Sequence, residues 1–118
     1  MTATVDLPAL PTSEVELIDR ASALIRAGWT RGNFHRNRQG KDLYCLLGAL
    51  EKAATGGRLK AGTDPEILYR RVTDRMRTIL RRRDGMRSSA LYRFNDEAKS
   101  KHAVLALLAA ARQEAADG

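Results

Sequence analysis

The feature that most constrains this chain is a helical repeat of apolar residues. In residues 13–28 the apolar side chains recur every three or four positions, at Leu17, Ile18, Ala21, Leu24 and Ile25. This spacing places them on one face of an α-helix. Ser13 followed by Glu16 is typical of a capping box at a helix start, and Gly28 suits a helix end. We therefore predict a helix from about residue 13 to residue 28.

The same repeat predicts three further helices, over residues 42–54, 64–83 and 99–116. We expect Ser100 or Asp96 to cap the last of them, because both side chains accept hydrogen bonds from free amides at a helix start. The chain contains no internal repeat and no low-complexity segment. The pattern is typical of an all-α protein.

The segments between these helices are polar. We interpret residues 29–41 as a polar loop and residues 88–96 as a segment with one short turn. No strand is predicted, because nowhere do four or more residues alternate between apolar and polar. Residues 43–50 contain no charge, and a helix that is apolar all round is a buried one. The expected fold is therefore all-α, a compact four-helix single domain with the helix at about 42–54 in its centre.

The length of 118 residues suits one hydrophobic core. Residues 1–11 hold two of the three prolines and no periodic pattern, so we expect a flexible N-terminal arm followed by a single helical domain over 12–116. The longest apolar run, residues 103–111, has nine residues against the roughly 20 that a membrane helix needs. We expect no membrane partner and a cytoplasmic location.

The charge of the chain is uneven. The net charge is +7, and residues 58–101 carry thirteen basic and six acidic groups. Around the predicted helix at 64–83, Arg70, Arg77 and Arg81 fall opposite the apolar stripe.

A second row of arginines flanks that stripe. It consists of Arg71, Arg75 and Arg82, and Arg83 and Arg87 extend it. Arg36 and Arg38 add cations in the polar loop. Arginine presents a planar fork of donors that matches phosphate. The pattern indicates contact with an anionic partner, either nucleic acid or an acidic protein.

Two observations favour a simpler interpretation of these arginines as a solvated surface. Charged rows on helices are often only solvated, and no nucleic-acid-binding module is recognisable. The connection between the helices at 42–54 and 64–83 has about nine residues, whereas a helix-turn-helix needs about three or four.

Cys45 is the single cysteine, so the chain forms no internal disulfide. With Asp42 as the cap, Cys45 would fall in the first helical turn, where the pKa of a thiol is lowered. His35 or His102 could then act as a base, with Asp96 as its orienting group. The cysteine lies in an apolar run, however, and burial raises the pKa of a thiol. We interpret Cys45 as a packing residue and expect no enzyme, no cofactor and no metal site.

Short motifs give the chain a resemblance to a known family. They are W-T-R-G at residues 29–32, C-L-L-G-A-L at 45–50 and F-N-D at 94–96, followed by an apolar helix with Val104, Leu107 and Ala111. This pattern resembles a small helical domain family of bacteria and phages that has no assigned function. Phe94 stands where the family pattern has tryptophan. Because the family is uncharacterised, the resemblance assigns no functional site.

The resemblance does imply that the motif residues are neighbours: Trp29, Gly32, Cys45, Gly48, Ala49, Asn95 and Asp96. We expect Trp29 to lie on the small-residue face of the helix at 42–54. Gly48 would let another segment approach closely, because a glycine inside a helix otherwise costs about 0.5–1 kcal/mol. Asn95 and Asp96 would cap the following helix or accept backbone amides of the long loop.

The sequence therefore leaves three functional hypotheses. The first is a non-enzymatic binding or regulatory module that uses the arginine face of the helix at 64–83, together with the loop at 31–41. The second is a protein-interaction accessory, phage-related, that uses an exposed apolar patch. The third is a thiol enzyme acting through Cys45.

Overall fold

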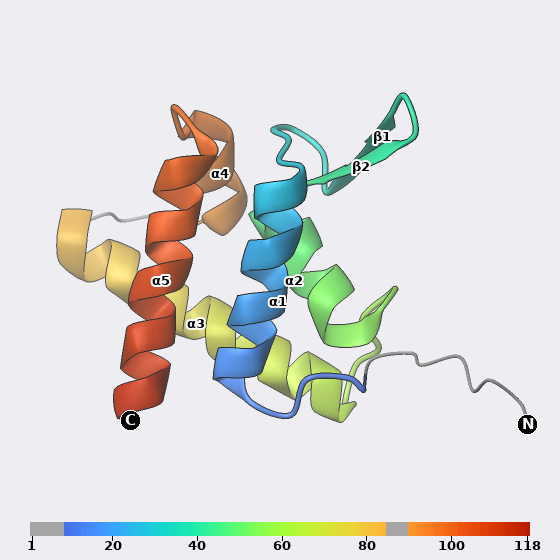
Figure 1. Cartoon of the computed structure of the whole chain (residues 1–118). Helices are drawn as coiled ribbons and strands as arrows, with labels where there is room; N and C mark the ends of the chain where they lie inside the picture. The colour runs from blue at the N-terminus through green and yellow to red at the C-terminus, as the bar shows by residue number, and fades with distance from the viewer. Residues whose placement is uncertain (1–8, 85–89) are drawn as a thin grey trace, which may run out of the picture.

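The computed structural model describes residues 9–84 and 90–118, and within them the chain forms five helices and one two-stranded sheet (Figure 1). The elements are α1 (Glu14–Ala27), β1 (His35–Arg38), β2 (Lys41–Tyr44), α2 (Leu46–Thr55), α3 (Asp64–Asp84), α4 (Leu91–Glu97) and α5 (Lys101–Asp117). The expected all-α, four-helix fold is therefore wrong. It lacked the β1–β2 hairpin, and it took α4 for a single turn.

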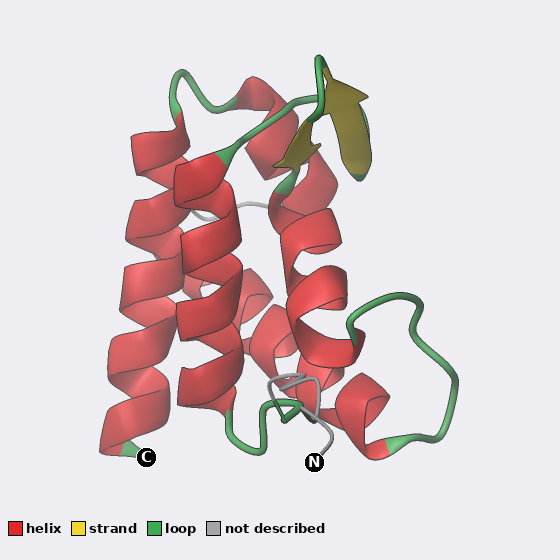
Figure 2. Ribbon diagram, turned by 45° about the vertical axis from the view of Figure 1, so that its right-hand side comes forward, coloured by secondary structure: helices red, strands yellow, loops and turns green. Residues whose placement is uncertain are grey.

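The helices pack around α1 and α2. Helix α1 contacts α2, α3 and α5, whereas α2 contacts α1, α3 and α4. Figure 2 shows α1, α2 and α5 standing side by side, and Figure 1 shows α3 crossing behind α1 and α5. Helix α1 thus shares the central place that the sequence had assigned to residues 42–54 alone.

The core is aliphatic. Its largest fully buried side chains come from every helix: Leu17, Ile18, Ile25, Leu46, Leu50, Val72, Met76, Leu80, Leu91, Val104, Leu107 and Leu108. None of the helices described is long and apolar enough to cross a membrane. Of the predicted arm, residues 1–8 lie outside the described residues, and Pro11 is already buried against the domain.

The hairpin replaces part of the predicted loop and the predicted start of the second helix. His35 pairs with Tyr44 and Arg38 with Lys41 in an antiparallel register. Gln39 and Gly40 form the turn with φ angles of 53° and 80°. Positive φ at both central residues is typical of a type I′ turn, whose twist matches that of the two strands.

Helix α2 consequently begins at Leu46, and its N-cap is Cys45 instead of Asp42. The Sγ atom of Cys45 accepts a hydrogen bond from the amide of Gly48 at 3.3 Å. The carboxylate of Asp42 is used within the hairpin, where it accepts from the side chain of Asn37. Ser100 precedes α5, although its side chain makes no capping hydrogen bond.

Candidate anion-binding surfaces

The predicted arginine face lies on α3, and most of it is exposed. Arg70, Arg71, Arg81, Arg82 and Arg83 are exposed, and the side chain of Arg77 is 36% exposed. The apolar side of the helix is buried at Val72, Met76, Ile79 and Leu80. Arg87 lies outside the described residues. We call Arg70, Arg71, Arg77, Arg81, Arg82 and Arg83 the α3 arginine face.

Arg75 does not belong to this face. Its guanidinium donates to Glu14 of α1 at 2.8 Å and lies 3.9 Å from Glu114 of α5. The hydrogen bond with Glu14 raises the pKa of Arg75 above its ordinary value. Arg75 is therefore a tertiary link between three helices and is 28% exposed. The prediction that it binds a partner is not supported by this position.

Three members of the α3 arginine face are paired with carboxylates. Arg70 pairs with Glu66, Arg82 pairs with Glu114, and Arg77 lies 3.1 Å from Asp74. The pairs of Arg77 and Arg82 are exposed on both sides, and such pairs contribute about 0–1 kcal/mol. In the pair of Arg70, the Glu66 side chain is only 13% exposed.

The remaining members, Arg71, Arg81 and Arg83, make no ion pair within the described residues. The net positive charge of the face therefore survives the pairing.

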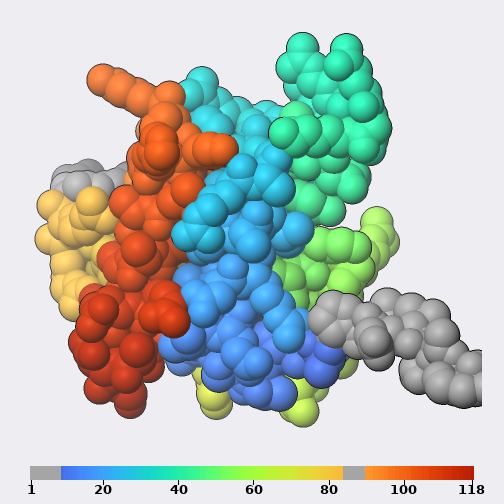
Figure 3. All heavy atoms as spheres, viewed as in Figure 1, coloured from blue at the N-terminus to red at the C-terminus, as the bar shows by residue number. Residues whose placement is uncertain are grey.

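Arg36 and Arg38 lie on a different surface, the β1–β2 hairpin. The hairpin projects from the helical body at the end of the molecule where α1 ends (Figures 1 and 3). Figure 1 places it on the opposite side from the C-terminal part of α3. The structure therefore separates the two basic segments that the sequence had combined into one surface.

The two faces of the hairpin differ in charge. On one face, His35 Nε2 lies 2.8 Å from Asp42 Oδ1, and Asn37 donates to the same oxygen at 3.2 Å. These contacts lower the pKa of Asp42, with the hydrogen bond to His35 as the largest cause. The rings of His35 and Tyr44 also stack on this face, with centroids 4.9 Å apart.

The opposite face holds Arg36, Arg38 and Lys41, because alternate residues of a strand point to opposite sides. Leu43, the register partner of Arg36, completes this face. In the part of the chain that the structure describes, none of the three cations makes an ion pair. We call these three residues the basic hairpin face.

Two glycines allow the hairpin to pack against the helices. A Cβ on Gly28 would lie 2.5 Å from the carbonyl oxygen of Asp42. A Cβ on Gly48 would lie 1.9 Å from the carbonyl oxygen of Phe34. That oxygen accepts the amide of Cys45 at 3.1 Å. The segment that approaches Gly48 is therefore the backbone before β1, and the base of the hairpin is fixed between α1 and α2.

The motif residues meet at Asn95, which is fully buried. Its Oδ1 accepts from the indole of Trp29 at 2.7 Å and from the amide of Leu46 at 3.0 Å. Its Nδ2 donates to the carbonyl of Thr30 at 3.1 Å and to Asp96 at 3.2 Å. One amide side chain thus connects α4 with the start of α2 and the segment after α1.

Asp96 ties the same segment a second time, since its carboxylate accepts the amide of Gly32 at 2.8 Å. Arg31 places its guanidinium 5.0 Å from the ring centre of Trp29 and donates to the carbonyl of Ala98. Trp29 is therefore held by Asn95 and Arg31. We had expected Trp29 on the small-residue face of α2, but at Gly48 the backbone of Phe34 occupies that face.

Cys45 and Ala49 are parts of the interior. Cys45 is 3% exposed and Ala49 is fully buried. Burial raises the pKa of the Cys45 thiol above its ordinary value. A buried thiol with a raised pKa is a poor nucleophile. Over residues 9–84 and 90–118, no three histidine, cysteine, aspartate or glutamate side chains gather as metal ligands would.

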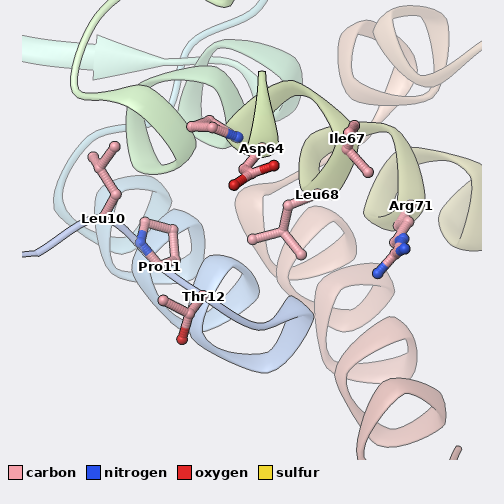
Figure 4. A pocket seen from close by; sticks show the side chains of 8 residues that line it. Leu10, Pro11, Thr12, Asp64, Ile67, Leu68 and Arg71 are labelled. Carbon is pink, nitrogen blue, oxygen red and sulfur yellow. The ribbon is translucent and has the colours of Figure 1, made fainter. Parts of the chain in front are cut away.

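A partly apolar hollow lies beside the N-terminal part of α3, against the chain that enters α1. Figure 4 shows Leu10 and Pro11 facing Leu68, with Asp64, Ile67 and Arg71 also lining the hollow. Leu10 is 45% exposed and Ile67 is 44% exposed. This hollow could not be predicted from the sequence, because Leu10 belongs to a segment without a periodic pattern.

These observations define a small helical domain with a projecting basic hairpin and an arginine-rich helix. Residues 10–114 match a family that is described as a family of unknown function, DUF6197. The chain belongs to this family. This confirms the expectation that its family has no assigned function. No curated protein and no solved structure matches the chain.

Proposed function

We propose that this domain is a non-enzymatic binding module of the cytoplasm that contacts an anionic partner, nucleic acid, through the α3 arginine face. One observation carries the proposal. Residues 70–83 contain seven arginines and one acid, and all of these arginines except Arg75 remain on the surface. Arg70, Arg77 and Arg81 lie on the side of the helix away from the core.

The mechanism is charge neutralisation. Arg70 and Arg77 pair with Glu66 and Asp74 on their own helix, and phosphates of a partner would replace these weak contacts. Arg81 donates to the hydroxyl of Thr78, at 3.5 Å. Each phosphate that an arginine neutralises releases a condensed counterion, and this release favours association at low salt.

The test is a triple variant, Arg70→Gln, Arg77→Gln and Arg81→Gln, analysed by elution from a heparin column in a salt gradient. Glutamine keeps the helix propensity of arginine, so the cooperative thermal transition should be retained. We expect elution at clearly lower salt than for the wild-type protein.

The matched control is Arg26→Gln, Arg93→Gln and Lys99→Gln. It removes the same charge from exposed positions of α1, α4 and the segment after α4. Equal elution of the two triple variants would contradict a specific role for α3, because net charge alone would then explain retention.

A second candidate function, a phage-related protein-interaction accessory, is favoured by the apolar hollow of Figure 4. Exposed Leu10 and Ile67 there form the kind of apolar patch that such a module needs. Ile67→Lys should abolish capture of a protein partner and leave heparin elution no earlier than in the wild type. The third candidate, a thiol enzyme, is disfavoured by the burial of Cys45 and by the raised pKa of its thiol.

A further inference from the structure

The basic hairpin face has a charge arrangement that folding alone does not favour. Arg38 and Lys41 are register partners, and Arg36 follows on the same side. Like charges directly opposite each other destabilise a strand pair. The only acid of the two strands, Asp42, points to the other face, where His35 and Asn37 occupy its Oδ1. An anionic partner would relieve this repulsion.

We propose that the β1–β2 hairpin enters the major groove of duplex DNA and contacts it through Arg36, Arg38 and Lys41. The inference rests on the proposed function for the anionic nature of the partner. It adds the class of nucleic acid and a second contact surface that is separate from α3.

The dimensions of the hairpin suit the groove. Two antiparallel strands lie about 4.8 Å apart, and the major groove of B-DNA is about 12 Å wide, so a two-stranded ribbon fits with its side chains. The hairpin stands clear of the helices in Figures 1 and 3, so its tip meets no obstruction from the domain.

The hairpin is also held against the helices in the absence of a partner. The amide of Tyr44 donates to the carbonyl of Gly28 at 2.9 Å, and the amide of Thr30 donates to the carbonyl of Tyr44 at 3.1 Å. The close approach at Gly48 holds the other strand. A partner would therefore not have to order the hairpin on binding, which reduces the entropic cost of association.

The placement of the aromatic residues favours a duplex over a single strand. Single-strand binding relies on aromatic rings that stack on bases beside the cations. Phe34, His35 and Tyr44 instead line a hollow on the side of the hairpin that faces α2, together with Glu51, Lys52 and Arg58. Arg36, Arg38 and Lys41 lie on the opposite face of the hairpin, where the strand register places Leu43 beside them. Arginine forks on a ribbon without aromatic neighbours suit guanine edges and phosphates in a groove.

The experiment measures fluorescence anisotropy of a short labelled DNA duplex with the wild-type protein and with Arg36→Gln/Arg38→Gln/Lys41→Gln. Each cation that neutralises a phosphate contributes about 0.9 to the slope of log affinity against log salt, so the variant should lose up to about 2.7 of that slope. We expect the affinity at moderate salt to fall by more than about tenfold. Because the three side chains are exposed and form no ion pair with another described residue, the thermal transition of the variant should match that of the wild type.

Other outcomes separate the two proposals. If the hairpin variant binds the duplex as tightly as the wild type while the α3 variant loses binding, the hairpin inference is wrong and the proposed function stands. Tighter binding of single-stranded RNA than of duplex would also overturn the inference. If the wild type binds no duplex, the inference fails, and the heparin comparison of the α3 variant decides the proposed function by itself.

Discussion

Gly48→Ala tests the packing of the hairpin base against α2. The new Cβ would lie 1.9 Å from the Phe34 carbonyl oxygen, whereas ordinary contact begins at 3.4 Å, so the two must separate by about 1.5 Å. That separation would break the 3.1 Å hydrogen bond from the Cys45 amide, and a buried unsatisfied group costs about 1–3 kcal/mol. Overpacking costs about 1–3 kcal/mol, and the better helix propensity of alanine returns up to about 1 kcal/mol.

We therefore expect Gly48→Ala to lower the free energy of unfolding by about 2–3 kcal/mol. This corresponds to a drop in Tm of roughly 10 °C for a domain of this size, measurable by circular dichroism. Gly57→Ala is the matched control, because a Cβ there meets nothing within 4 Å and its effect should stay within about 0.5 kcal/mol. A Gly48→Ala protein as stable as the control would refute the close approach.

Three further predictions concern the interior. Asn95→Ala removes the buried hydrogen-bond partner of the Leu46 amide and the Thr30 carbonyl. The free energy of unfolding in urea should therefore fall by about 3 kcal/mol. A fall below about 1 kcal/mol would contradict the connecting role of Asn95. Burial raises the pKa of Tyr69 from 10.0 to about 12, so this tyrosine ionises at lower pH in the unfolded chain than in the folded one. The free energy of unfolding should therefore fall as the pH rises from 10 towards 12. A Tyr69→Phe protein should lack this fall when Tm is measured at alkaline pH. A thiol reagent should label Cys45 far more slowly in the native protein than in urea, and equal rates would show that the thiol is accessible.

The long helices could be predicted from the sequence because their apolar residues carry the repeat. The helix predicted at 64–83 is observed as Asp64–Asp84, and the helix predicted at 13–28 is observed as Glu14–Ala27, so the ends differ by one residue at most. In each case burial of one face dictates the pattern. Residues 10–114 also match a family of unknown function, as the short motifs implied.

The hairpin could not be predicted in the same way. Its first strand is exposed at all four positions, so no alternation of apolar and polar residues marks it. The turn is Gln39-Gly40 instead of the Asn-Gly or Asp-Gly pairs that signal a type I′ turn. Because the hairpin was not predicted, the predicted second helix began at residue 42, whereas α2 begins at Leu46. For the same reason the cap was assigned to Asp42 instead of Cys45.

The candidate arginine surface could be predicted only where the position of a residue around its own helix decides its exposure. The helical spacing correctly placed Arg70 and Arg81 away from the apolar stripe. It could not show that Arg75 meets Glu14, which is 61 positions away in the sequence. A helical projection contains no information about neighbouring helices, so an arginine beside the apolar stripe can equally bind solvent, a partner or another helix.

We propose above that this domain binds an anionic partner by charge neutralisation. The most direct measurement is the anisotropy of labelled duplex DNA and of labelled single-stranded RNA with the wild-type protein across a salt series. We expect log affinity to fall linearly with log salt, with a slope that corresponds to roughly four or more phosphates. Absence of binding to both the duplex and the single strand at about 50 mM salt, where the electrostatic contribution is strong, would contradict binding by charge neutralisation and leave the arginines as a solvated surface.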